Sequence, residues 1–258
     1  MKKGNGQTGV MLGVPIGRKP LSVLTAEALS AIRAEAPPLV FACANPHSLV
    51  TAQTDTVFYE ALINAEQVVA DGIGTVLLAK LIRANIGPRI TGSDYFVSVM
   101  QALNNLGGAR VFFFGSSEKV LNLIAARIRL DFHNITVCGC TAPPFCDWPE
   151  DENHELLERI RAAKPDVLWV GMTAPKQEKW VFVNRYKLSV PVVGSIGAVF
   201  DFYAGTYPRA PQWLCRIGME WAYRLLSEPR RMWRRNFVST PVFIASVIWR
   251  HVCGLGGR

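Results

Sequence analysis

The sequence predicts an α/β fold: a Rossmann-like parallel sheet with helices on both faces, followed by a basic helical C-terminal appendage. Short apolar segments alternate along the chain with segments of helical periodicity, which is typical of repeated βα units. The apolar segments are continuous, as expected for strands covered on both faces. Near residue 207 the composition also changes, because acidic side chains become rare beyond it.

The apolar segments expected to form strands span residues 10–14, 39–43, 68–70, 110–114, 135–140, 167–170 and 192–196. The helices expected between them span residues 22–35, 46–65, 93–106, 118–130 and 150–163, and two more follow residues 72 and 175. Residues 143–149 are expected to form a loop. Residues typical of helix ends mark several boundaries: Asn45-Pro46 opens one helix, Pro37-Pro38 ends another, and Gly107-Gly108 ends a third.

The 258 residues suit one large domain with an appendage. Residues 209–258 contain nine Arg and two acidic residues, a net charge of +7, whereas the preceding 208 residues have a net charge of +1. We therefore predict an α/β core over residues 1–207 and a basic amphipathic appendage over residues 208–258. No run of 18 apolar residues occurs, so we expect no transmembrane helix.

Metal sites are not expected from the sequence. It contains no Cys-x-x-Cys or His-Glu-x-x-His motif, so a zinc site is not indicated. It also contains no Asp-x-Asp pair of the kind that would hold a divalent cation on a diphosphate. We interpret the six cysteines as mostly reduced thiols of a cytosolic protein.

Asp71 is the first candidate for a chemical role, because it directly follows the apolar segment 68–70 and precedes Gly72 and Gly74. Open α/β sheets bind ligands beyond the carboxyl ends of their strands. A carboxylate at that place can take a proton from a substrate hydroxyl. We interpret Asp71 as a catalytic base; the alternative is that it only caps the next helix, since Asp is a preferred N-cap residue.

Other expected strand ends carry small or polar residues that should line the same crevice. They are Asn45, Gly115-Ser116-Ser117 and Gly171-Met172-Thr173. Gly115 opens a turn whose backbone N–H groups suit a phosphate at a helix N-terminus. An ordinary capped turn fits this segment equally well.

Two further polar segments are candidates for substrate contacts. Arg89 precedes a helix start, and its guanidinium group suits a phosphate, although a surface loop in which Asp94 caps the helix fits as well. Gln177 lies in the hexad Pro175–Trp180, in the first turn of an expected helix. It is a candidate for contacting a nucleobase or a sugar, and a solvated first turn is the alternative.

Arginine and aromatic residues are interleaved in residues 209–235. Such a segment fits an element that lies on an anionic membrane surface. Arg224, Arg231 and Arg234 share one face if the helix continues past Pro229, and three guanidinium groups there suit a diphosphate. A solvated charged face over an aromatic core stripe is the alternative. No nucleic-acid recognition module is visible, so we expect no nucleic acid partner.

Taken together and in this order, the motifs resemble those of the WecG/TagA/CpsF glycosyltransferases. The resemblance covers residues 9–237, and its segments are Asp71–Gly74, Arg89–Asp94, Gly171 with Pro175–Trp180, Gly194–Phe202 and Arg209–Arg231. It implies an inverting transfer of a hexose from a UDP-sugar to a sugar on a polyprenyl diphosphate, without a metal or another cofactor. It places the enzyme at the cytoplasmic membrane face, in bacterial exopolysaccharide, capsule or teichoic acid synthesis.

The resemblance also implies residue roles. Asp71 matches the proposed general base of the family, and Gln177 would lie beside the donor. The tail arginines that stabilise the diphosphate match Arg224, Arg231 and Arg234. The complete set of expected substrate-binding residues is Cys43, Asn45, Arg89, Gly115, Gly171 and Gln177.

One position departs from the family pattern. Many members have Thr where this chain has Cys43, two residues before Asn45, and a thiol is a weaker hydrogen-bond donor than a hydroxyl. The donor therefore stays open between UDP-N-acetylmannosamine and UDP-glucose. A membrane-docked nucleotide-sugar-binding protein without turnover is the alternative function. The apolar tail fits contact with the inner membrane or formation of a homo-oligomer equally well.

Overall fold

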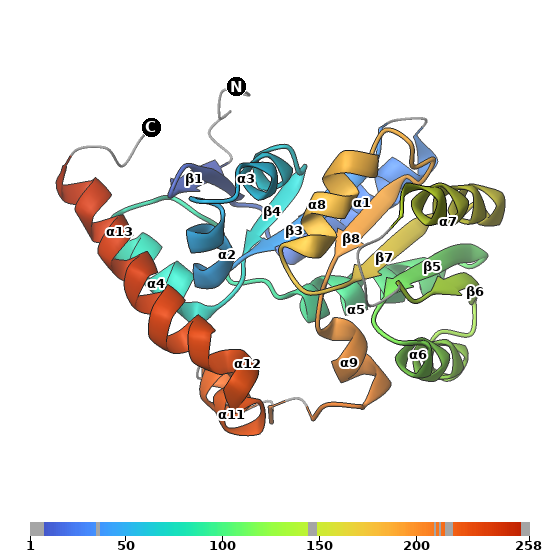
Figure 1. The fold of residues 1–258 in the computed structure, drawn as a ribbon. Helices are drawn as coiled ribbons and strands as arrows, with labels where there is room; N and C mark the ends of the chain where they lie inside the picture. The colour runs from blue at the N-terminus through green and yellow to red at the C-terminus, as the bar shows by residue number, and fades with distance from the viewer. Residues whose placement is uncertain are drawn as a thin grey trace.

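The computed structural model describes residues 8–34, 37–143, 149–208, 210–211, 213–214 and 219–253, with only the backbone of Arg231. Within them, six strands form one sheet in the order β4-β3-β8-β7-β5-β6, and every strand pair is parallel. The strands are β3 (Leu39–Ala44), β4 (Gln67–Ala70), β5 (Ala109–Gly115), β6 (Ile135–Thr141), β7 (Val167–Gly171) and β8 (Val192–Ser195). Figure 1 shows helices on both faces of this sheet, so the predicted α/β class is confirmed.

The two faces of the sheet are covered by different helices. One face carries α1 (Leu21–Arg33), α5 (Gly92–Leu106), α6 (Glu118–Asp131) and α9 (Val199–Ala204). The other carries α3 (Thr56–Ile63), α7 (Glu150–Ala163) and α8 (Lys176–Asn184). On the first face, the ring of Phe41 stacks on that of Tyr95, and the Trp169 ring lies edge-on to Tyr95. These rings fix α5 against the centre of the sheet.

The predicted first strand is wrong. Instead of one strand over residues 10–14, β1 (Thr8–Met11) and β2 (Val14–Gly17) form an antiparallel hairpin. Its two turn residues, Leu12 and Gly13, have positive φ angles of 50° and 83°. Two-residue hairpin turns of type I′ require positive φ angles at both central residues. Leu seldom adopts such an angle, so the sequence did not indicate a turn at Leu12.

The predicted helix over residues 46–65 is also wrong in its length. The chain forms two helices there, α2 (Pro46–Thr51) and α3 (Thr56–Ile63). Asp55 starts the second one, because its side chain accepts a hydrogen bond from the backbone N–H of Phe58. The remaining predicted core helices agree with the structure to within a few residues. Most of the loop expected at 143–149 lies outside the described residues.

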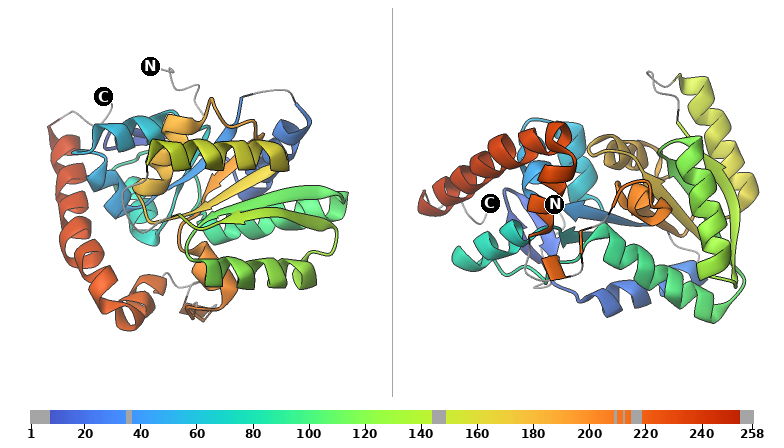
Figure 2. Two further views of the ribbon diagram at one scale, coloured as in Figure 1. Left: turned by 45° about the vertical axis from the view of Figure 1, so that its right-hand side comes forward. Right: turned by 90° about the horizontal axis from the view of Figure 1, so that it is seen from below.

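The tail helices lie on the side of the molecule where β4 is the edge strand, away from α6 and α7 (Figures 1 and 2). They are α11 (Glu220–Ser227), α12 (Pro229–Trp233), the π-helix η1 (Arg234–Ser239) and α13 (Thr240–Val252). Phe243 and Val247 of α13 are buried in one apolar cluster with Leu49 and Phe58 of the core. No helix among the described residues is long and apolar enough to cross a membrane.

Candidate active site

A polar cavity of about 120 Å³ lies beyond the carboxyl ends of four neighbouring strands, β4, β3, β8 and β7. Asp71 directly follows β4, and Cys43 and Asn45 lie at the end of β3. Ser195 is the last residue of β8, and Met172 follows β7. Because the strands are parallel, their carboxyl ends meet at one edge, where open α/β sheets bind ligands.

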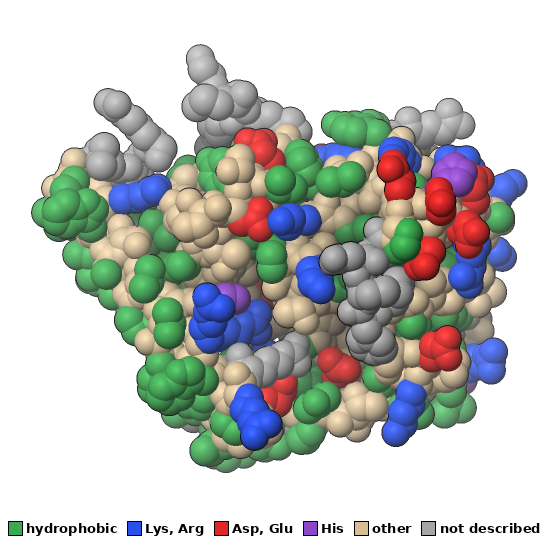
Figure 3. Space-filling view, in the orientation of Figure 1, with side chains coloured by type: hydrophobic (Ala, Val, Ile, Leu, Met, Phe, Trp, Pro, Cys, Tyr) green, Lys and Arg blue, Asp and Glu red, His purple; other side chains and the backbone are tan. Residues whose placement is uncertain are grey.

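A second cavity, of about 400 Å³, adjoins the first and lies between α4 (Ile73–Leu81) and the tail. Its wall includes the apolar side chains of Ile73, Trp221, Met232 and Phe237. The residues that line both cavities are Asn45, Asp71, Glu220, Arg224 and Arg235. Figure 3 shows Lys and Arg side chains gathered beside a hollow on this face, with hydrophobic side chains over the adjoining tail.

Asp71 lies at the junction of the two cavities, and the alternative that it caps α4 is wrong. The N-cap residue is Gly72, with a positive φ of 99°, and no side chain caps this helix end. The backbone N–H of Asp71 donates to the Ala44 carbonyl, which fixes the residue at the strand end. Burial raises the pKa of the Asp71 carboxyl, and the nearby charge of Glu220 raises it further, against the opposing effect of nearby arginines.

Arg89 connects the core to the tail. Its Nη2 atom donates to Oε2 of Glu220 on α11 over 2.9 Å, and both side chains are largely shielded from solvent. Arg89 lines the larger cavity, so the structure brings it to the candidate site. Asp94 caps α5 in a reciprocal capping box with Thr91. The cap expected of Asp94 is therefore confirmed, whereas a phosphate contact of Arg89 stays a prediction.

Gln177 lines the polar cavity but is not part of a solvated first turn. Its side chain is buried, and its Oε1 atom accepts hydrogen bonds from the backbone N–H groups of Met172 and Gly197. Its Nε2 atom donates to Glu178 Oε1 over 2.8 Å. Gln177 thus connects the loop after β7 to the loop after β8 and fixes the relative position of these two walls of the cavity.

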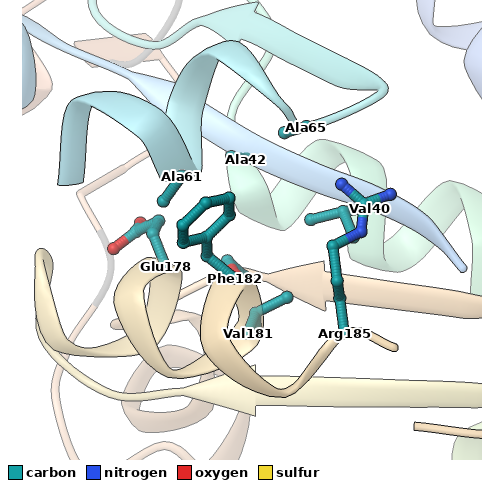
Figure 4. Close-up of a pocket in the computed structure, with 9 residues that line it drawn as sticks. Val40, Ala42, Ala61, Ala65, Glu178, Val181, Phe182 and Arg185 are labelled. Carbon is teal, nitrogen blue, oxygen red and sulfur yellow. The ribbon is translucent and has the colours of Figure 1, made fainter. Parts of the chain in front are cut away.

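Glu178 is a buried carboxyl that the sequence did not single out. Burial raises its pKa to about 7, although the hydrogen bond from Gln177 acts in the opposite direction. Arg185, the C-cap residue of α8, lies about two helical turns beyond Glu178. Its guanidinium is bound to Glu66 and to two backbone carbonyls instead. Figure 4 shows the Phe182 ring between Glu178 and Arg185, with the Glu178 carboxyl turned away from the arginine.

The tail supplies arginines, but not the expected set. Arg224 lines both cavities, its Nε and Nη2 atoms are buried without a hydrogen-bond partner among the described residues, and its guanidinium lies 5.2 Å from the Phe202 ring centroid. Arg235 also lines both cavities. Arg234 is exposed and is a lining residue of neither, and the Arg231 side chain lies outside the described part of the structure.

These arginines were expected to share one face only if the helix continued past Pro229, and that condition is not met. The chain leaves the helical conformation at Glu228, with φ −132° and ψ 61°, and a π-helix then begins at Arg234. The sequence shows Arg235 only as one of four arginines in residues 230–235, because helical spacing from Arg224 is not defined across the interruption at Glu228. Glu220 gave no signal in the sequence, because its role depends on a contact with Arg89 in a distant segment.

Gly115 and Gly171 are buried at the ends of β5 and β7 and line neither cavity. A Cβ atom on Gly115 would lie 2.5 Å from the Gly171 carbonyl oxygen, and one on Gly171 would lie 2.4 Å from the Phe200 ring. Close packing therefore explains both glycines. Ser117 caps α6 by accepting from the Val120 N–H, as in the capped-turn alternative. Among the described residues, no group of three or more His, Cys, Asp or Glu side chains is placed to hold a metal ion.

Comparison with known proteins places this site in a family. Residues 10–254 match the Glycosyl transferase WecG/TagA/CpsF family. The chain belongs to this family. It is therefore an enzyme that transfers a sugar. The match to the family extends over nearly the whole chain, as the order of the motifs in the sequence suggested.

Several relatives carry the name N-acetylglucosaminyldiphosphoundecaprenol N-acetyl-beta-D-mannosaminyltransferase. The protein from Bacillus spizizenii is 32% identical over 205 residues, which cover 80% of this chain and 77% of the relative. The protein from Bacillus subtilis is 28% identical over 209 residues, 81% of this chain and 78% of the relative. A Staphylococcus aureus protein is 26% identical over 209 residues, 81% and 79% of the two chains.

Proposed function

We propose that this chain is an inverting β-glycosyltransferase that moves a hexose from a UDP-sugar to a sugar linked to a polyprenyl diphosphate. The observation that carries the proposal is the position of Asp71 in the shared wall of two cavities of different character. A transfer between two substrates needs such a meeting point. The names of the relatives favour N-acetylmannosamine as the transferred sugar and N-acetylglucosamine on the lipid diphosphate as the acceptor.

The smaller, polar cavity suits the sugar end of the donor, and the larger, more apolar cavity suits the lipid-linked acceptor. Arg224 and Arg235 line both and offer positive charge to a diphosphate. The buried Nε and Nη2 atoms of Arg224 support this role, since buried charged donors without partners are costly unless a ligand supplies acceptors. Arg89 adds a further cation beside the larger cavity.

In the proposed mechanism, Asp71 takes the proton from the acceptor hydroxyl. The resulting oxygen attacks the anomeric carbon from the face opposite UDP, and the bond to the diphosphate oxygen breaks with its electron pair. The anomeric centre inverts to a β-linkage. The raised pKa of Asp71 makes it a stronger base than an exposed carboxylate. Arg224 and Arg235 offset the charge that develops on the leaving diphosphate.

The tail supports a location at the cytoplasmic face of the inner membrane, as a peripheral protein. Large apolar side chains on the tail helices are exposed, and they include Trp221, Trp233, Phe237, Ile248 and Trp249. Exposed aromatic residues beside arginines favour the interface of an anionic bilayer, where the polyprenyl acceptor would reside. The same surface also supports a homo-oligomer, which sedimentation with and without anionic vesicles would distinguish. Synthesis of a cell-surface polysaccharide is the process that this acceptor implies.

A donor and acceptor screen tests the proposal. The full chain in nanodiscs would be offered UDP-N-acetylmannosamine, UDP-glucose and UDP-N-acetylmannosaminuronic acid. Each donor would be paired with polyprenyl-diphosphate-linked N-acetylglucosamine or glucose, with and without EDTA. We expect turnover with UDP-N-acetylmannosamine and the N-acetylglucosamine acceptor, unaffected by EDTA, and a β-linked product by NMR. An α-linked product, or no turnover with any of these pairs, would contradict the proposal.

A further inference from the structure

Three residues that line the polar cavity each have a buried side-chain atom with no hydrogen-bond partner among the described residues. The atoms are Oγ of Ser48 on α2, Oγ of Ser195 at the end of β8, and Oε2 of Glu178 on α8. The three residues are 1%, 1% and 5% exposed, respectively. Three separate elements thus each contribute one unsatisfied polar group to the wall of the same cavity.

This absence of partners is not a general property of the cavity wall. Gln177 lines the same cavity, and its amide oxygen and nitrogen are hydrogen-bonded to Met172, Gly197 and Glu178. Buried polar groups in folded proteins are nearly always paired, because leaving one unpaired is unfavourable. Several unpaired groups around one cavity therefore indicate that a ligand supplies the missing partners.

Asp71 and Glu178 both lie near Cys43. After burial, their charges are the next causes that raise the pKa of the Cys43 thiol. Arg224 and Arg235 reach the same cavity from α11 and η1. A donor with its diphosphate at the arginines and its anomeric carbon near Asp71 would place its sugar ring against this group of side chains.

The size of the cavity points to the same part of the donor. Its volume of about 120 Å³ is well below the roughly 300 Å³ at which pockets for whole drug-sized ligands begin. It therefore suits one ring of a nucleotide sugar and not the whole molecule. Two hydroxyls and a carboxyl group match a hexose, whose hydroxyl and amide substituents both donate and accept hydrogen bonds.

We propose that Ser48, Ser195 and Glu178 form the subsite that holds the transferred sugar and that they determine which hexose the enzyme accepts. The inference rests on the proposed function, because it takes a UDP-sugar as the donor. Each of the three side chains pairs with a hydroxyl or amide group of the sugar. Discrimination then follows from unpaired groups: a hexose that lacks a matching substituent leaves a buried polar atom without its partner.

Calorimetric binding of UDP-N-acetylmannosamine and of UDP to the full chain tests the subsite. The variants are Ser195→Ala and Glu178→Gln, which retain nearly the native volume. Ser98→Ala is the matched control, since Ser98 lies on α5, contacts Thr25 and is not a lining residue of the cavity. We expect the sugar nucleotide to bind each site variant about 3- to 10-fold more weakly, as the loss of one hydrogen bond predicts. UDP should bind all variants as it binds the native chain.

Each contrary result has a distinct meaning. If both ligands bind the site variants more weakly by the same factor, the three side chains hold the nucleotide, and the sugar-subsite inference is overturned. If Ser195→Ala and Glu178→Gln bind the sugar nucleotide as Ser98→Ala does, the inference is overturned while the donor class stands. If the native chain binds neither ligand, the proposed function itself fails, and the subsite falls with it.

Discussion

The two cavities that meet at Asp71 are built by different means. The polar cavity belongs mainly to the sheet: its walls follow four parallel strands, and Gln177 ties two of its loops together. The larger cavity depends on the tail, whose attachment includes the Arg89–Glu220 ion pair and the buried Phe243 and Val247. One half of the site is therefore part of the protein core, and the other half is added to it.

This difference separates the tasks of the site. The sheet half positions the carboxylate and the unpaired polar groups, which need fixed geometry. In the proposed function, the tail half brings cationic side chains and exposed apolar surface, and these attract a diphosphate and a lipid without such exact placement. A division of this kind predicts that substitutions in the sheet half affect the chemical step and stability most strongly, whereas substitutions in the tail half mainly affect charge compensation.

The largest expected effect belongs to the junction itself. Asp71→Asn removes the base but keeps the size of the side chain, so kcat should fall about 10²- to 10⁴-fold while UDP binding is retained. Activity of the native chain should also decline as the pH falls through the raised pKa of Asp71, because a protonated carboxyl cannot accept the hydroxyl proton. Steady-state rates and calorimetry on the same preparations measure both effects. Near-normal turnover by a folded variant would remove Asp71 from its assigned role.

The next largest effect is a dependence of stability on pH that arises from the burial of Glu178 in the sheet half. Glu178 has a pKa of about 7 in the folded chain, against an ordinary value of 4.5, so the folded state binds its proton more tightly than the unfolded state does. Stability from this group is fully present below pH 4.5 and is lost as the pH rises to about 7. The loss amounts to ~3 kcal/mol. Cys43 and Arg235 are charged or titratable groups close to it.

Urea unfolding of the native chain and of Glu178→Gln at pH 5 and pH 7 measures this loss. The neutral glutamine cannot ionise, so the free energy of unfolding of the variant should change less over this interval than that of the native chain. Equal pH dependence in the two proteins would show that the Glu178 carboxyl is ionised in the folded state throughout.

The sheet half could be predicted from sequence to a large extent. Its strands are continuous apolar runs that end in small or polar residues, and local composition alone marks both features. Asp71 and Asn45 were found in this way, as residues that directly follow a strand. The first hairpin was missed because Leu12 adopts a left-handed conformation that this residue type seldom shows. The pattern of hydrophobic residues does not indicate such a turn.

The tail half was predicted less well, for a physical reason. Arginine spacing identifies a helical face only while the helix is unbroken, and here it is interrupted at Glu228 and widened into a π-helix at Arg234. The burial of Gln177 and Glu178 was equally hidden, because it arises from contacts with loops and helices far away in sequence. Whether a polar residue is solvated, paired or left for a ligand is a tertiary property.

The adjacent residues Arg235 and Arg234 differ in their contact with the two cavities. Arg235 lines both cavities, whereas its neighbour Arg234 is exposed and lines neither. Arg235→Ala should therefore lower kcat/KM by about 10- to 100-fold, the cost of one charge-assisted contact to the diphosphate. Arg234→Ala should change it much less. The adjacent pair controls for the net charge of the tail. If Arg234→Ala proved the more damaging, the diphosphate would lie outside the described cavities.

The smallest expected effect concerns the ion pair that joins the two halves. Glu220→Gln removes the partner of Arg89 and one of the two causes that raise the Asp71 pKa, so this pKa should fall. The acid limb of kcat/KM should accordingly move to lower pH, and the rate at neutral pH should change only several-fold, since partly exposed ion pairs contribute about 1 kcal/mol. The exposed pair Glu158–Arg161 on α7 offers a matched control in Glu158→Gln, which should leave the acid limb in place. If the acid limb of kcat/KM stays in place in Glu220→Gln as well, Glu220 does not raise the pKa of Asp71. The tail would then contribute charge to the site without changing the base, and the two halves would act on the reaction independently.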